Sequence, residues 1–95
     1  MAAYVIADVD VTDPAAYAEY RTLVPKSLEP YGGRFLVRGG AHEVLEGEWK
    51  PKRLVVLEFP TRAAAERWYA SEEYRHAKAI RLRAARTNVV LVEGV

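Results

Sequence analysis

Hydrophobic and polar residues alternate at the start of the chain, and the spacing then changes to that of a helix. The alternation over residues 3–11 predicts a β-strand. Asp13 followed by Pro14 is typical of an N-cap and a first helical residue. Aromatic and aliphatic residues follow at helical spacing, at Tyr17, Tyr20, Val24 and Leu28. We therefore predict a strand and then a helix that Pro25 ends or kinks.

Glycine pairs and a long irregular stretch separate the next two strands. Gly32-Gly33 predicts a turn before a strand over residues 34–38, and Gly39-Gly40 ends that strand. Residues 41–52 form a connection longer than the two to five residues usual in a hairpin, and connections of this length are often functional. The apolar run over residues 53–59 predicts a further strand that Pro60 stops.

Two cap signals divide the second helical region. Thr61 can cap a helix that runs through residue 70, and Ser71, followed by two glutamates, can cap a segment that restarts or kinks the helix through about residue 85. Residues 87–93 are again rich in β-branched residues and predict the last strand.

The predicted order of elements is β-α-β-β-α-β, which indicates one α+β domain over residues 1–95. This order is the signature of the ferredoxin-like fold, a four-stranded antiparallel sheet with two helices. Because crossover connections are right-handed, both helices are expected on the same face of the sheet.

The predicted strands are apolar on both sides of the pleat, although helices are expected to cover only one face. A sheet whose second face met water would alternate instead. The simplest cover for that face is the same face of a second copy, so we expect a homodimer with isologous symmetry. The alternative is that a few exposed β-branched residues are tolerated, since much of any protein surface is apolar.

Composition narrows the range of partners. The chain is 51% hydrophobic and 28% charged with a formal net charge of +1, which is typical of a folded protein and too balanced for a dedicated nucleic-acid binder. The locally basic stretch over residues 75–86 is best interpreted as a solvated helix face. Neither a secretory signal nor a membrane-spanning run is visible, so we expect a cytoplasmic protein without membrane contact.

Arg81 is the first candidate for catalysis or ligand contact. Tyr74, Ala77 and Arg81 follow one another at steps of three and four residues, so they share the side of the helix that approaches the sheet. An arginine there can hold a carboxylate or another anion. The alternative is a salt bridge to an internal acid such as Glu58.

Glu58 is the second catalytic candidate, because it interrupts the most apolar strand. An ionised carboxylate in such a place is costly unless it is paired, and it would suit a general acid or base. An internal ion pair with Arg38 or Arg81, or a position near the strand's end that reaches water, would explain it equally.

Arginine and aromatic residues supply the candidates for ligand binding. Arg38 precedes two glycines that permit close approach, and Trp49 lies in the long connection, where it can close over a cleft. Tyr69 and Tyr74 add aromatic surface with polar tips, which is useful around a flat or apolar ligand. Most aromatic residues are nevertheless expected in the core or the dimer interface.

Neither metal nor thiol chemistry is indicated. The chain has no cysteine, and its two histidines, His42 and His76, lack the paired spacing of a zinc or non-haem iron site. His76 could serve haem only as a single axial ligand, and a lone helical histidine is more often a surface residue. We therefore expect no cofactor.

Several short strings occur in an order that resembles a known family. They run from about residue 4 to residue 94 and include Tyr31-Gly32-Gly33-Arg34-Phe35, Arg38-Gly39-Gly40, Glu58-Phe59-Pro60 and Trp68-Tyr69. Together they resemble the domain of unknown function 1330, within the dimeric α/β-barrel superfamily. The resemblance implies a ferredoxin-like protomer that pairs through its sheet, with a cleft between sheet and helices in each subunit. It implies no activity.

Two classes of function remain open. The first is a small-molecule site in the cleft, which either binds a small organic ligand or supports cofactor-free monooxygenase or isomerase chemistry. The second is a structural or interaction role in which the internal charges pair with each other. An open cleft with unpaired polar groups would favour the first class.

Overall fold

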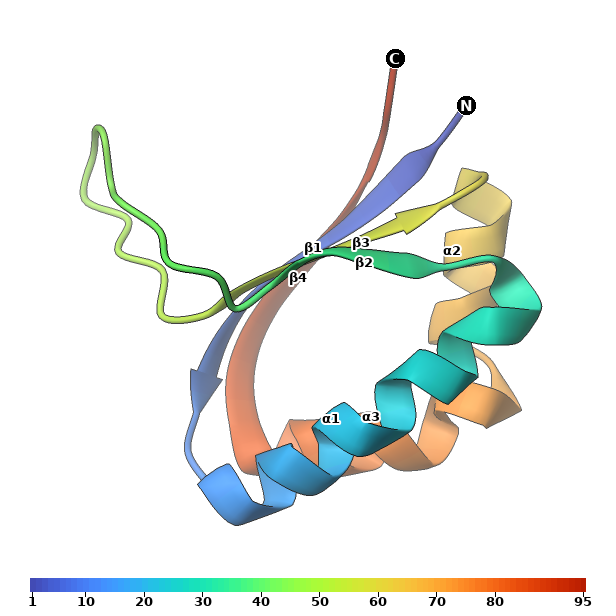
Figure 1. Cartoon of the computed structure of the whole chain (residues 1–95), viewed down its shortest axis with the longest axis horizontal. Coiled ribbons are helices and arrows are strands. Elements are labelled where there is room, and N and C mark those ends of the chain that lie inside the picture. The colour runs from blue at the N-terminus through green and yellow to red at the C-terminus, as the bar shows by residue number, and fades with distance from the viewer.

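The computed structural model describes all residues, 1–95, as four strands, three α-helices and a short 3-10 helix (Figure 1). Their bounds are β1 Ala3–Val11, α1 Pro14–Leu28, η1 Glu29–Tyr31, β2 Arg34–Arg38, β3 Leu54–Phe59, α2 Arg62–Tyr69, α3 Glu72–Ala84 and β4 Ala85–Glu93. The predicted order of elements is confirmed, with the second helical region divided in two.

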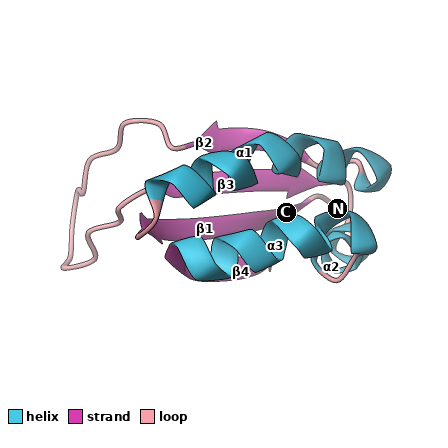
Figure 2. Cartoon of the chain, turned by 90° about the horizontal axis from the view of Figure 1, so that it is seen from below, coloured by secondary structure: helices cyan, strands magenta, loops and turns pink.

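The strands form one antiparallel sheet in the order β2-β3-β1-β4. Helices α1 and α3 lie side by side across one face of this sheet, and no element covers the other face (Figures 1 and 2). The α+β, ferredoxin-like fold expected from the sequence is thus confirmed.

Strand alternation assigns each side chain to one of the two faces. Val5, Ala7 and Val9 of β1 face the helices, whereas Tyr4, Ile6 and Asp8 face away from them. The register pairs Val5 with Leu57 and Tyr4 with Glu58, so the parity of β1 carries over to β3. We call the side that carries Tyr4 and Ile6 the open face.

Pro25 does not end helix α1, which continues to Leu28. Asp13 caps the helix as expected, because its carboxylate accepts a hydrogen bond from the backbone N–H of Ala16. A proline at position 25 has no N–H for the carbonyl of Arg21, one turn earlier. The consequence is a free backbone acceptor on the helix, beside strand β2.

The break between α2 and α3 follows from two caps. The hydroxyl of Thr61 accepts from the N–H of Ala64, and that of Ser71 accepts from the N–H of Tyr74. Strand β4 begins at Ala85, two residues earlier than expected, because the backbone of Ala85 is already extended and pairs with Val11. Helix α3 therefore leads directly into β4.

An aromatic cluster holds the helices on the sheet. Trp68, Phe59 and Tyr74 are almost completely buried, with Trp68 stacked on Tyr74 at 4.0 Å and 5.3 Å from the Phe59 ring between centroids. The indole N–H of Trp68 donates to the Ser27 hydroxyl, which itself donates to the Val24 carbonyl. Trp68 of α2 thus contacts α1, α3 and β3 at once.

None of the helices combines the length and the hydrophobicity that a membrane-spanning helix needs.

Gly33 and Gly40 offer a test of how tightly β2 packs on this core. A Cβ atom at Gly33 would lie 2.6 Å from the Phe59 ring and 2.9 Å from Leu28, whereas one at Gly40 would meet nothing within 4 Å. We expect Gly33→Ala to lower the free energy of unfolding by about 1–3 kcal/mol through overpacking. Gly40→Ala, the matched control, should change it by less than about 0.5 kcal/mol. Urea unfolding of both variants measures the difference, and equal stabilities would contradict the packing described.

Candidate functional site

A cleft lies between the sheet and the helices, with walls from β1, β2, β3, α1, α2, α3 and β4. Of the 17 residues that line this helix–sheet cleft, 13 are hydrophobic and the other four are arginines: Arg21, Arg38, Arg53 and Arg81. The cavity is partly open to solvent and has a volume of about 40 Å³. Since one water needs roughly 10–15 Å³ by this measure, the cavity has room for about three waters.

Two tyrosines form the polar centre of the cleft. The hydroxyl groups of Tyr20 and Tyr74 are 2.8 Å apart and hydrogen-bond to each other. Burial raises the pKa of Tyr20 far above its ordinary value, with a further contribution from the neighbouring Tyr74 hydroxyl, and burial likewise raises the pKa of Tyr74. Both phenols therefore stay protonated at neutral pH and can act as hydrogen-bond donors, but not as bases.

Arg81 reaches the same centre from α3. It is 4% exposed, and its guanidinium donates to the Thr87 hydroxyl on β4. Burial lowers the pKa of Arg81, but the neighbouring Tyr74 and Tyr20 outweigh this effect and raise it above its ordinary value. The spacing argument placed Tyr74 and Arg81 on the side of α3 that meets the sheet, and both line the cleft.

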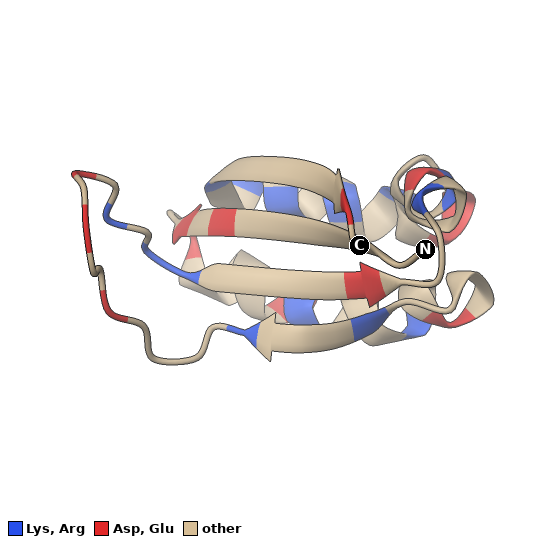
Figure 3. Cartoon of the chain, turned by 90° about the horizontal axis from the view of Figure 1, so that it is seen from above, with Lys and Arg blue, Asp and Glu red and all other residues tan.

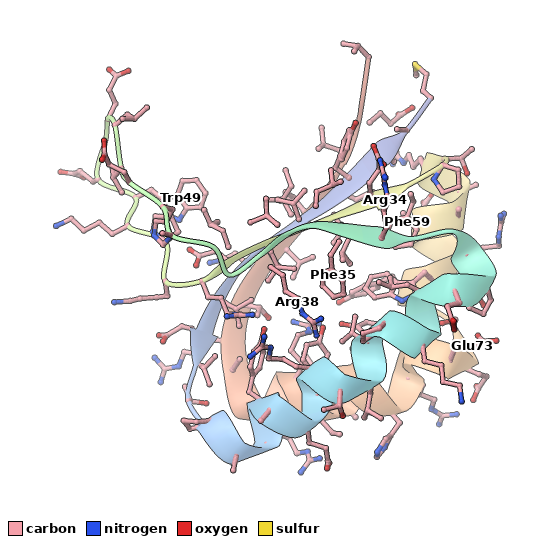
Figure 4. All side chains as sticks on the ribbon, viewed as in Figure 1. Arg34, Phe35, Arg38, Trp49, Phe59 and Glu73 are labelled. Atoms are coloured by element: carbon pink, nitrogen blue, oxygen red, sulfur yellow. The ribbon has the colours of Figure 1, made fainter.

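A β-bulge puts Phe35 and Arg38 on the same side of strand β2. Phe35 pairs with Leu57, but Val37 pairs with Val56, so Leu36 is an extra residue. Without this shift, residues three apart in a strand would point to opposite faces. Both side chains instead point toward α1 (Figure 4), and the Arg38 guanidinium lies 4.3 Å from the centre of the Phe35 ring.

The free carbonyl of Arg21 positions Arg38. One guanidinium nitrogen of Arg38, Nη2, donates to the Arg21 oxygen at 2.6 Å. Because Pro25 provides no N–H for that oxygen, the side chain of Arg38 replaces a helical hydrogen bond. The contact spans the edge of the cleft between β2 and α1.

Arg53 enters the cleft from the residue before β3. Its guanidinium lies 5.7 Å from the centre of the Tyr17 ring and so close to Gly39 that any Cβ atom there would overlap it. Its Nε atom is buried and has no hydrogen-bond partner in the protein. Gly39 also has a positive φ of 71°, so both the turn and the arginine require a glycine at this position.

Charge in the cleft has one sign. None of the four arginines takes part in any of the ion pairs of the structure. The lining contains no aspartate, glutamate, lysine or histidine. Buried or half-buried charges are normally paired. The cleft therefore offers cations and hydrogen-bond donors, and no side chain suited to general-base catalysis at neutral pH.

Glu58 lies outside the cleft. Its neighbours Leu57 and Phe59 face the helices, so Glu58 faces away from them, and it pairs with Arg34 at 2.6 Å. Glu58 is therefore in an ion pair, but its partner is Arg34, and the pairing with Arg38 or Arg81 considered from the sequence is wrong. The structure does not bring the two catalytic candidates, Glu58 and Arg81, together.

Trp49 is also separate from the cleft. The connection between β2 and β3 extends away from the body of the protein, and Trp49 lies on the side opposite the helices (Figure 4). Its indole N–H donates to the Asp8 carboxylate at 2.9 Å, and this hydrogen bond lowers the pKa of Asp8. Tyr69, in contrast, lines the cleft at the end of α2 and is 39% exposed.

Sequence reasoning missed Arg53 and Arg21 as parts of the site. The sequence analysis assigned Arg53 only to the start of a strand and did not single out Arg21. A proline four residues after Arg21 was the one signal for a free carbonyl at that place. No three histidine or carboxylate side chains lie close enough together to hold a metal ion.

The sequence matches one family model over residues 2–95, described as "Domain of unknown function (DUF1330)". The chain belongs to this family. The resemblance seen in the short sequence strings is confirmed. Among the curated proteins, none matches the sequence significantly.

Solved structures with similar folds come from several bacteria. A protein of unknown function from Rhodopseudomonas palustris, RPA0582, has a TM-score of 0.79 at 19% identity, over 99% of this chain and 82% of that one. A dimeric ferredoxin-like protein of unknown function from Jannaschia sp. has a TM-score of 0.69 at 15% identity, over 99% and 100%. SnoaB, a cofactor-independent oxygenase from Streptomyces nogalater, has a TM-score of 0.63 at 13% identity, over 99% of this chain and 92% of that one. At these identities the likeness concerns the fold alone.

The buried phenols lead to a prediction about alkaline pH. Because their pKa values are raised in the folded state, Tyr20 and Tyr74 contribute stability below the unfolded pKa of about 10 and lose it as pH rises above that value. We expect them to ionise only as the protein unfolds. Absorbance at 295 nm and circular dichroism, followed together, measure both events. Tyr20→Phe should reduce the late absorbance step by one tyrosine, and ionisation of every tyrosine before unfolding would contradict the burial.

Proposed function

We propose that the protein binds a small organic ligand in the helix–sheet cleft and works as a homodimer joined through its open face. The observation that carries the first part is the set of four arginines without carboxylate partners in an otherwise apolar cleft. Two of the four, Arg81 and Arg53, are buried and half-buried, and a cleft with a purely structural role would be expected to pair these two charges internally, since an unpaired buried charge is costly. Ligand binding explains why these charges have no partner within the protein.

Binding is favoured over acid–base catalysis by the chemistry of the lining. Proton abstraction needs a base within hydrogen-bond reach of the substrate. Glu58, the carboxylate considered for that task, faces away from the cleft and is paired with Arg34. The oxygenase among the similar structures supports the alternative of cofactor-free oxygen chemistry only through its fold.

The dimer is supported by the chemistry of the open face. The middle of all four strands carries no charged residue (Figure 3), and Val90 and Val92 are 57% and 46% exposed. Ile6 lies between Val90 and Val56 on the same face. Contiguous exposed apolar surface of this kind commonly marks a protein interface. One of the similar structures is described as a dimeric ferredoxin-like protein.

A charge on the open face tests the dimer. We expect Val90→Lys to weaken dimerisation at least tenfold, because a lysine would have to be desolvated in the interface. Leu82→Lys, on the solvent side of α3 where the leucine is 63% exposed, is the matched control. Light scattering after size exclusion measures the mass against the monomer mass of 10.7 kDa. A wild-type protein that is monomeric at all concentrations would refute the dimer.

A filled cavity tests ligand binding. Ala7 lies on the sheet wall of the cleft, so Ala7→Ile should occupy the cavity without removing any of the four arginines. We expect native mass spectra of the purified protein to show a retained small molecule that this variant lacks. Ala18→Ile, on the exposed side of α1, should retain it. Equal retention by both variants would place the ligand outside the cleft and contradict the proposal.

A further inference from the structure

We infer that the ligand is a small organic acid, whose carboxylate is held by Arg53 and Arg38 while its apolar part enters the cleft. This inference rests on the proposed ligand-binding function and specifies the chemistry of the ligand. Both arginines line the cleft beside α1: Arg38 donates to the Arg21 carbonyl, and the Arg53 guanidinium lies over the Tyr17 ring, one helical turn earlier.

The balance of charge in the cleft differs from that of the whole chain. Fourteen lysines and arginines are almost balanced by 13 aspartates and glutamates over the whole sequence. Four of the 14 basic side chains line the cleft, yet none of the 13 acids does. Like charges that share a poorly solvated space repel one another. An anion between them relieves this repulsion.

Arg53 has hydrogen-bonding capacity that the protein leaves unused. Its buried Nε has no acceptor among the protein's atoms, and its contacts are the Tyr17 ring and the backbone at Gly39. A guanidinium carries five N–H donors in a planar fork, which matches the two oxygens of a carboxylate. Gly39 leaves room for the guanidinium, which a side chain at that position would overlap.

Arg38 supplies a second guanidinium, and only part of its hydrogen-bonding capacity is used within the protein. Nη2 is committed to the Arg21 carbonyl, and the guanidinium packs on Phe35. These two contacts orient the side chain and still leave donors for a ligand. Because Arg38 and Arg21 are exposed at the edge between β2 and α1, an acid can reach the cleft there.

The interior of the cleft favours a carboxylate with an apolar body over a phosphate ester. Phe35, Val55, Leu57 and Trp68 present apolar surface behind the arginines, and the cavity is small. A planar monoanion fits the guanidinium fork with less bulk and a lower desolvation cost than a tetrahedral dianion. Because Tyr20 and Tyr74 share one hydrogen bond, one of their two hydroxyl groups then remains as a donor for a further oxygen of the acid.

Trp68 provides a fluorescent reporter for the test. The chain has two tryptophans, so Trp49→Phe leaves Trp68, on the cleft wall, as the only one. In this background, propionate, butyrate and benzoate are titrated alongside their neutral amides, with phenyl phosphate as the second anion. We expect saturable changes in Trp68 emission with at least one acid, bound at least tenfold more tightly than its amide and than phenyl phosphate.

Variants of Arg53 test whether this residue holds the carboxylate of the acid. Arg53→Met should weaken binding of the acid at least tenfold and leave the thermal midpoint of the free protein unchanged or higher, since a buried unpaired donor is removed. Arg53→Lys keeps the charge but loses the planar fork, so its affinity for the acid should lie between those of the parent and of Arg53→Met. Arg83→Met removes an exposed arginine from α3 and should bind like the parent.

The outcomes separate the two proposals. Amides or phenyl phosphate that bind as tightly as the acids would overturn the assignment of a carboxylate and leave ligand binding in the cleft intact. Undiminished acid binding by Arg53→Met would overturn the role of that residue. If no compound of either kind changes Trp68 emission saturably, both the acid and the proposed use of the cleft are refuted.

Discussion

The packing of Trp68 against Tyr74 is the contact on which the rest of the structure depends. Trp68 stacks on Tyr74 of α3, lies beside Phe59 of β3 and donates to Ser27 of α1. These contacts join all layers of the fold at one place. A large aromatic ring with one satisfied polar atom is well suited to such a position, because it buries much apolar surface without leaving an unpaired donor. The same ring forms a wall of the helix–sheet cleft, so stability and site share one residue.

The two faces of the sheet separate the two properties proposed for the protein. The face toward the helices carries the cleft and its arginines, whereas the open face carries the exposed valines and the ion pair between Glu58 and Arg34. Consecutive residues of one strand therefore serve different purposes. Leu57 lines the cleft, and Glu58, the next residue, belongs to the opposite surface. A change on one face can consequently be tested without disturbing the other.

Two local irregularities shape the cleft more than regular structure does. The bulge at Leu36 turns Arg38 to the helix side, and Pro25 leaves the Arg21 carbonyl free to hold it. Each feature would be a defect in an isolated element, because it interrupts a hydrogen-bond ladder. Together they place a guanidinium across the cleft edge. The unpaired Nε of Arg53 belongs to the same region and represents a cost to the free protein that a bound anion would offset.

The sequence by itself determined the order of elements, the fold class, the family and the side of α3 that carries Tyr74 and Arg81. These properties follow from local periodicity, helix caps and short sequence strings, all of which involve residues that are close together in the sequence. It also indicated Arg38, Tyr69 and Tyr74 as lining residues through their chemistry.

Only the tertiary structure decided which charged residues meet. The bulge reverses the parity of β2 after Leu36, and strand pairing brings Arg34 to Glu58 across 24 positions of sequence. Arg53 reaches the cleft because β3 lies beside β2. Trp49 lies outside the cleft because its loop brings it to Asp8. Such contacts depend on strand register and on the path of a long loop, and no local pattern of residues encodes either.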